Sequence, residues 1–74
     1  MDLGSFITGA EIIRKYYSAQ DGYHLAAEHD QIYLYATDRP MTEEDVLTVK
    51  ELGWFQDDVE DDEYDPNNSW SCYV

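Results

Sequence analysis

The residues best suited to chemistry are carboxylates gathered in a short run. The segment from residue 57 to residue 65 holds seven acidic side chains in nine positions. Carboxylates at this density can bind a divalent cation, or they can imitate the phosphates of a nucleic acid toward a basic protein. The seven candidate residues are Asp57, Asp58, Glu60, Asp61, Asp62, Glu63 and Asp65.

A calcium loop is the first interpretation to test. Asp61, Glu63 and Asp65 stand where positions one, three and five of an EF-hand loop would be. That loop needs glycine at position six and a bidentate glutamate at position twelve. Pro66 and Cys72 occupy those two positions, so the sequence predicts no specific calcium site.

The spacing of the charges favours nucleic-acid mimicry. Nine extended residues span about 30 Å, which places seven charges about 4 Å apart. One strand of DNA carries a phosphate about every 3.4 Å. A similar set of carboxylates would compete for the Lys and Arg side chains that normally hold a nucleic-acid backbone, and opposite charges would accelerate the encounter.

Two further groups of side chains are expected to contribute to this surface. Glu43, Glu44 and Asp45 form a second acidic cluster, expected in the first turn of a helix. Tyr64 and Trp70 are the predicted aromatic contacts with a partner, because tyrosine and tryptophan are enriched among the residues that dominate interfaces.

The chain offers no recognisable catalytic constellation. Cys72 is the only cysteine, which excludes an internal disulfide and a Cys-based zinc site. His24 and His29 are five residues apart, and an odd separation along a strand places side chains on opposite faces. No nucleophile elbow and no glycine-rich phosphate loop occurs. The sequence therefore predicts a protein that is not an enzyme, with no catalytic residue, no metal site and no cofactor.

Composition limits the class of protein and its partners. The chain has 74 residues and a net charge of −13, and 43% of its residues are hydrophobic. This predicts one small folded domain over residues 1–74 rather than a disordered acidic tail. Scarce Lys and Arg argue against direct binding to nucleic acid or to anionic membranes. Residues 1–40 carry a net charge of −3 and residues 41–74 carry −10, so the charge is localised.

The expected elements form an α+β fold that presents the acidic run as a loop. Two capping boxes, beginning at Thr8 and Thr42, predict helices that end at Asp21-Gly22 and at Gly53. Alternating residues predict a hairpin of strands 23–28 and 32–35, and two short strands at 54–56 and 69–74. The predicted order is α-β-β-α-β-β, with both helices on a small antiparallel sheet and an acidic loop at residues 57–68.

Size, the charge of −10 on residues 41–74 and the run from Asp57 to Asp65 together resemble one class of proteins. These are the small acidic inhibitors of bacterial defence encoded by phages, of which anti-CRISPR proteins and other DNA mimics are the familiar members. The resemblance implies an inhibitor that binds a Cas nuclease or a surveillance complex where target DNA would dock. It also implies a place in the cytoplasm of a bacterial host, which agrees with a lone thiol and the lack of a signal-length apolar run.

Two other functions use the same residues. An immunity or antitoxin protein would apply its acids to one cognate nuclease, and a generic interaction module would leave the acidic loop facing solvent. Open edges of a short sheet would also permit a homo-oligomer. The inhibitor and the immunity protein would both bind a basic protein, and the generic module would leave the loop in solvent. None of the three functions involves catalysis.

Overall fold

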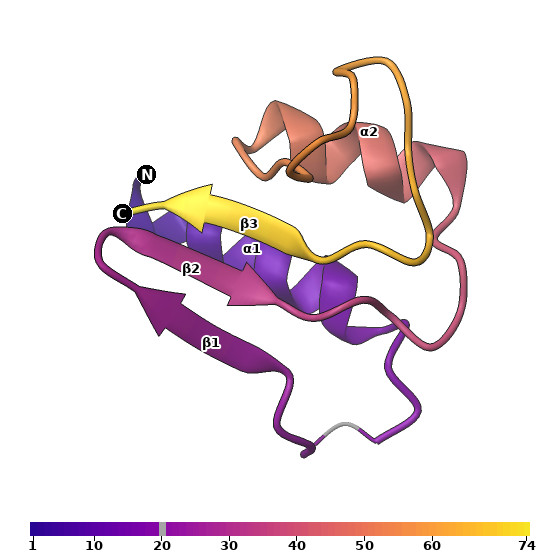
Figure 1. Ribbon diagram of the computed structural model, residues 1–74, viewed down its shortest axis with the longest axis horizontal. Coiled ribbons are helices and arrows are strands. Elements are labelled where there is room, and N and C mark those ends of the chain that lie inside the picture. Colours follow the sequence, from indigo (N-terminus) through magenta and orange to yellow (C-terminus); the bar gives the residue numbers. More distant parts are fainter. Residues whose placement is uncertain (20) are drawn as a thin grey trace.

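Two helices and a three-stranded antiparallel sheet share one core. The first helix crosses one face of the sheet, and the second lies past the edge formed by the last strand (Figure 1). The computed structural model describes residues 1–19 and 21–74. The order α-β-β-α-β confirms the predicted α+β class. The elements along the chain are α1 (Leu3–Arg14), β1 (Leu25–Glu28), β2 (Gln31–Leu34), α2 (Glu43–Glu51) and β3 (Trp70–Tyr73).

The sheet has the strand order β1-β2-β3. The predicted hairpin is confirmed: β1 and β2 pair antiparallel with Leu25 opposite Leu34, and His29 takes a positive φ of 56° in the connecting turn. The predicted strand at 54–56 is wrong, because only Phe55 reaches the sheet, through a single bridge to Ser71. The chain turns at Asp57 and Asp58, where Asp58 takes a positive φ of 61°, so the pairing ends after this bridge.

The core lies between the helices and the sheet. Alternation along β2 and β3 brings Leu34, Trp70 and Cys72 to the face that the helices cover. Ile13 from α1 and Val49 from α2 are fully buried against them. The remaining members of this core are Tyr17, Met41, Val46 and Trp54.

Helix α1 begins five residues before the predicted cap. Its N-cap is Asp2, whose carboxylate accepts the backbone N–H of Ser5 at 2.9 Å, so the capping box predicted at Thr8 is wrong. Gly9 instead lies buried in the middle of the helix, facing the indole of Trp54. A glycine at this position serves the close approach of a neighbouring ring rather than the start of a helix.

Helix α1 also ends earlier than predicted, at Arg14 rather than at Asp21-Gly22. The backbone carbonyl of Tyr16 accepts the N–H groups of Asp38 at 3.1 Å and Arg39 at 3.3 Å. These long-range bonds hold the chain after the helix against the segment that follows β2. Tertiary contacts have therefore replaced the predicted helix after Arg14, over residues 15–19.

Helix α2 follows its sequence signals closely. The Thr42 hydroxyl accepts the N–H of Asp45 at 3.2 Å, which confirms the second capping box. Val46 and Val49 face the core, as their spacing predicts. Gly53 has a φ of +104°, the left-handed conformation that ends many helices at glycine.

Tyr17 gives the fold an expected sensitivity to alkaline pH. Its buried hydroxyl donates to the carbonyl of Tyr35, and burial raises the pKa of Tyr17 to about 12, with the nearby charge of Asp38 adding to the shift. An unfolded tyrosine ionises near pH 10. Stability from the neutral hydroxyl is therefore fully present below pH 10 and is lost between pH 10 and 12, at a cost of about 3 kcal/mol.

Urea unfolding followed by tryptophan fluorescence between pH 9 and 12 measures this loss. Tyr17→Phe should lower stability at pH 7 by about 1 kcal/mol, because the hydrogen bond is gone. The same variant should show a flatter dependence on pH above 10. An equally steep alkaline loss in the variant would assign that loss to other groups.

Candidate functional site

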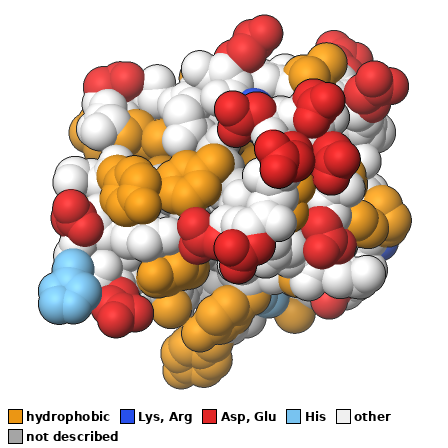
Figure 2. All heavy atoms as spheres, turned by 45° about the horizontal axis from the view of Figure 1, so that its top comes forward, with side chains coloured by type: hydrophobic (Ala, Val, Ile, Leu, Met, Phe, Trp, Pro, Cys, Tyr) orange, Lys and Arg blue, Asp and Glu red, His pale blue; other side chains and the backbone are white. Residues whose placement is uncertain are grey.

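The acidic loop, residues 57–68, leaves the sheet region and extends past α2 before the chain enters β3 (Figure 1). All seven predicted carboxylates of this loop are exposed. Acidic side chains gather over this part of the surface in Figure 2, with exposed hydrophobic side chains nearby. Across residues 1–19 and 21–74, no ion pair involves any of the seven. Their negative charge is therefore directed to solvent.

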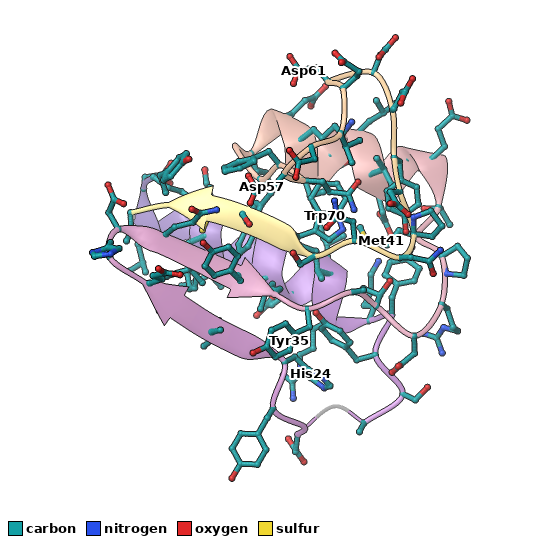
Figure 3. The ribbon with its side chains drawn as sticks, viewed as in Figure 1. His24, Tyr35, Met41, Asp57, Asp61 and Trp70 are labelled. Atoms are coloured by element: carbon teal, nitrogen blue, oxygen red, sulfur yellow. The ribbon has the colours of Figure 1, made fainter. Side chains whose placement is uncertain are left out.

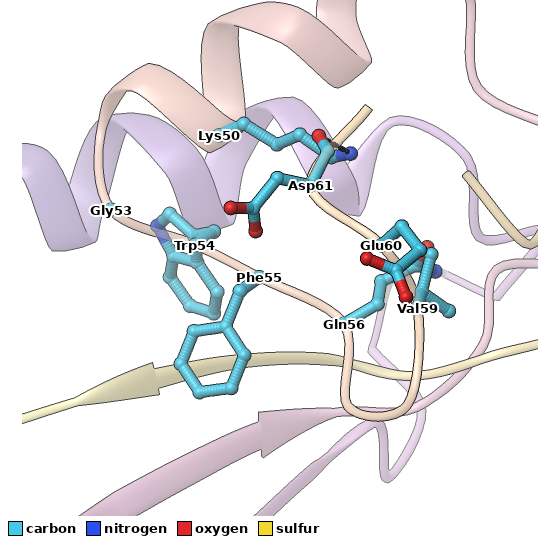
Figure 4. A pocket seen from close by; sticks show the side chains of 8 residues that line it. All are labelled: Lys50, Gly53, Trp54, Phe55, Gln56, Val59, Glu60 and Asp61. Carbon is cyan, nitrogen blue, oxygen red and sulfur yellow. Dashed lines mark hydrogen bonds between the residues drawn. The ribbon is translucent and has the colours of Figure 1, made fainter. Parts of the chain in front are cut away.

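Lys50 holds the far end of the acidic loop through its backbone. It is the only basic residue in positions 41–74, and its ammonium group donates to the carbonyl oxygens of Asp61, at 2.7 Å, and of Glu63. Figure 4 shows Lys50 reaching across to Asp61. Because the lysine binds carbonyls, it orders the loop, and the carboxylates next to it form no ion pair within residues 1–19 and 21–74.

Gln56 fixes the base of the acidic loop. Its side chain is 5% exposed, and its amide nitrogen donates to the carbonyls of Asp65 at 2.7 Å and Asn68 at 3.2 Å. Its amide oxygen accepts the N–H of Asp65 at 2.9 Å. Asn68 in turn donates to the carbonyl of Asp57 at 2.8 Å. The side-chain amides of Gln56 and Asn68 thus join the two ends of the acidic loop.

The acidic loop is curled and is not the extended row that the spacing estimate assumed. The N–H of Glu63 bonds to the carbonyl of Glu60 at 3.0 Å, and Asp58 has a positive φ of 61°. The whole protein is 30 Å in its longest dimension, so an extended run of about that length would span the molecule. Turns therefore gather the charges into a patch instead of a line.

The second acidic cluster is only partly available to a partner. Glu43 and Glu44 are exposed in the first turn of α2. Asp45 instead accepts hydrogen bonds from the Tyr16 hydroxyl and from Lys15 at 3.1 Å. The bond from Tyr16, followed by that from Lys15, lowers the pKa of Asp45. Asp45 therefore connects α2 to the end of α1, and its contact with a partner stays a prediction.

Trp70 is a core residue rather than a surface contact. Only 1% of Trp70 is exposed, so the prediction that it contacts a partner is wrong. Figure 3 places it beneath the acidic loop, with Asp57 at the base of that loop and Asp61 at its far end. Tyr64 is half-buried and stacks on Trp70 with ring centroids 6.0 Å apart, and its hydroxyl accepts the N–H of Met41 at 2.9 Å. This pair supports the loop from below.

The two histidines have separate surroundings. His24 stacks on Tyr17 with ring centroids 3.8 Å apart, and its ring nitrogen contacts the carbonyl of Ala19. His29 is exposed in the hairpin turn. Within the described part of the chain, no three His, Cys, Asp or Glu side chains converge as they would around a metal ion. In the same residues, no helix has the length and apolarity to cross a bilayer.

A depression of about 360 Å³ lies where the acidic loop meets the end of α2 (Figure 4). Phe55 and the buried Trp54 give it apolar walls, and Glu60 and Asp61 line it from the loop. These groups can bind a cation or a basic side chain.

Sequence reasoning found the exposed acids but missed the residues that hold them. The sequence marks Lys50 in one way, because it is the single basic residue among the eleven acids of positions 41–74. Gln56 and Asn68 carried none, because glutamine and asparagine are ordinary surface residues until a structure buries them. No protein-family model, curated protein or solved structure matches this chain.

Proposed function

We propose that this protein is a non-enzymatic inhibitor that occupies the basic nucleic-acid-binding groove of a bacterial protein. A Cas nuclease or a surveillance complex is the partner class that we favour, with a phage as the source of the inhibitor and the bacterial cytoplasm as the place of action. The observation that carries the proposal is the set of seven exposed loop carboxylates without an ion pair in the described residues.

The ordering of the acidic loop supports this function. Lys50 and Gln56 hold the loop by its backbone, so the loop backbone does not have to be ordered when a partner binds. A pre-ordered surface binds more tightly because less conformational entropy is lost on association. A concentrated negative field also accelerates encounter with a basic groove, as phosphates would. Glu43 and Glu44 on α2 extend the same field.

Neutralising the far end of the loop tests the proposal. The triple variant Asp61→Asn, Asp62→Asn, Glu63→Gln should bind its partner about 30-fold more weakly at low salt, because three charge contacts are lost. Its affinity should also depend less steeply on salt concentration. The measurement uses the DNA-binding protein that the tagged wild-type chain captures from a bacterial lysate.

A matched control separates local charge from total charge. The variant Glu11→Gln, Glu28→Gln, Asp30→Asn also removes three exposed acids and leaves the same net charge of −10, but outside residues 41–74. Its affinity for the captured partner should change less than threefold. Equal losses in both variants, or no loss in the loop variant, would contradict a role for the acidic loop.

A further inference from the structure

A second groove, of about 250 Å³, lies between α2 and the acidic loop. Its apolar lining comes from Met41, Val46, Leu47 and Tyr64. Met41 and Val46 are buried in the core, whereas Leu47 is 55% exposed and has no place in that core. The groove therefore offers apolar surface that the fold does not cover. It is smaller than the clefts of roughly 300–1,000 Å³ that hold drug-sized ligands.

The other residues of this groove are charged. Four carboxylates line it, from Glu43 on α2 and from Asp61, Asp62 and Glu63 on the acidic loop. Lys50 is the one basic residue among the lining residues, and its ammonium donates to the loop carbonyls of Asp61 and Glu63. An apolar lining beside four carboxylates matches one kind of side chain, which has an aliphatic stem and a positive end.

We propose that this groove binds a lysine or arginine side chain of the partner, with the stem along Leu47 and the charged end among the four carboxylates. The inference rests on the proposed function and adds a contact that phosphate mimicry lacks. Long basic side chains cover apolar surface with their methylenes while the charged group stays in water. Each buried methylene strengthens binding by about fourfold. The carboxylates attract the charged end of the basic side chain, and the apolar contact makes the affinity depend on the length of its stem.

Lys50 shows how this loop receives an ammonium group. Its own stem lines the same groove, and its charged end lies against the backbone of Asp61 and Glu63. An incoming basic side chain would lie beside that stem and use the carboxylates that Lys50 leaves without an ion pair. The occupied groove would hold the Lys50 stem and the partner's stem side by side. Its four carboxylates would outnumber the two positive charges.

The test measures binding of a fluorescein-labelled decalysine peptide by fluorescence anisotropy at several salt concentrations. Leu47→Ala should bind it about fivefold more weakly with an unchanged salt dependence, because apolar contact is lost and no charge is removed. Leu25→Ala is the matched control, since Leu25 is 60% exposed on β1, and its affinity should stay within twofold of wild type. Leu47 is exposed and alanine favours helices, so the variant should fold.

A second probe tests the stem directly. A decamer of 2,4-diaminobutyric acid, used at pH 6 beside decalysine, carries the same charges on stems two methylenes shorter. Wild-type protein should bind it about 16-fold more weakly than decalysine, since two methylenes are missing, and Leu47→Ala should remove most of that preference. Equal affinity for both probes, or full decalysine affinity in Leu47→Ala, would overturn the groove proposal. Failure of the loop-neutralised triple variant to weaken either probe would contradict the charge contact of both proposals, because three of the four groove carboxylates belong to the acidic loop. A normal loss in that variant, together with equal affinity for the two probes, would overturn the groove proposal alone.

Discussion

Replacing Gln56 with glutamate is expected to lower the free energy of unfolding by about 3 kcal/mol at pH 7. One carboxylate oxygen could still accept the N–H of Asp65, as the amide oxygen does at 2.9 Å. The other would face the carbonyls of Asp65 and Asn68, which now accept from the amide nitrogen at 2.7 and 3.2 Å. A buried negative charge would then meet two acceptors without a donor between them.

The same variant separates loop order from total charge. Gln56→Glu raises the magnitude of the net charge by one, yet it should weaken partner binding, because the acidic loop loses its attachment at the base. If net charge alone drove binding, affinity would rise slightly. Tighter binding by Gln56→Glu would therefore contradict the role assigned to the ordered loop.

The loss of stability in Gln56→Glu should depend on pH. Burial among carbonyls would raise the pKa of the introduced carboxyl in the folded state above the unfolded value of about 4.3. Protonation restores a donor, so the difference from wild type should be small below pH 4 and grow as the pH rises. Urea unfolding from pH 4 to pH 7 measures it. Gln56→Met, which lacks all three hydrogen bonds at any pH, is the control and should show a constant difference.

Gly9→Ala is expected to destabilise the protein by about 3 kcal/mol, through overpacking of the core. A Cβ atom at this position would lie 2.0 Å from the Nε1 atom of Trp54 and 2.4 Å from its Cδ1 atom. Both distances are well inside van der Waals contact, so the buried indole or α1 must move. Alanine's better helix propensity returns only about 1 kcal/mol.

Gly4→Ala is the matched control for Gly9→Ala, in the same helix. Its Cβ would lie 3.3 Å from the Asp2 carboxylate, a contact that a shift of a few tenths of an ångström relieves, and Gly4 is exposed. We expect a change within about 1 kcal/mol of wild type. Urea unfolding gives both values, and a shifted tryptophan emission in Gly9→Ala alone would report displacement of Trp54. Equal stability of the two variants would contradict the packing described for Gly9.

Local signals predicted the parts of the fold that local contacts determine. Thr42 and Gly53 bound α2 as expected, because capping and a left-handed glycine are properties of the adjacent backbone. The similar pattern at Thr8 misled, since the glycine next to it is required by Trp54, 45 positions later. Asp2 is the N-cap of α1. The pattern at Thr8 resembles a full capping box, so the start of the helix was predicted there instead.

The candidate site also combines features that the sequence predicts with features that only the fold reveals. Exposure of the loop acids follows from their charge, since unpaired carboxylates are rarely buried. Trp70 was predicted to contact a partner but is buried beneath Tyr64, and Asp45 accepts hydrogen bonds from Tyr16 and Lys15. Such long-range pairings have no signal in a single sequence. Residues that hold the loop therefore appear only once the fold is known.

Competition with DNA is the most direct test of the central claim. The captured partner is purified, bound to a fluorescent DNA duplex that carries its recognition site, and titrated with the wild-type chain while anisotropy is recorded. The chain should displace the duplex completely, and excess unlabelled duplex should release the chain from the partner, since both would occupy one basic groove. A ternary complex of partner, duplex and chain, with unchanged affinity for the duplex, would contradict the mimicry of nucleic acid by the acidic loop.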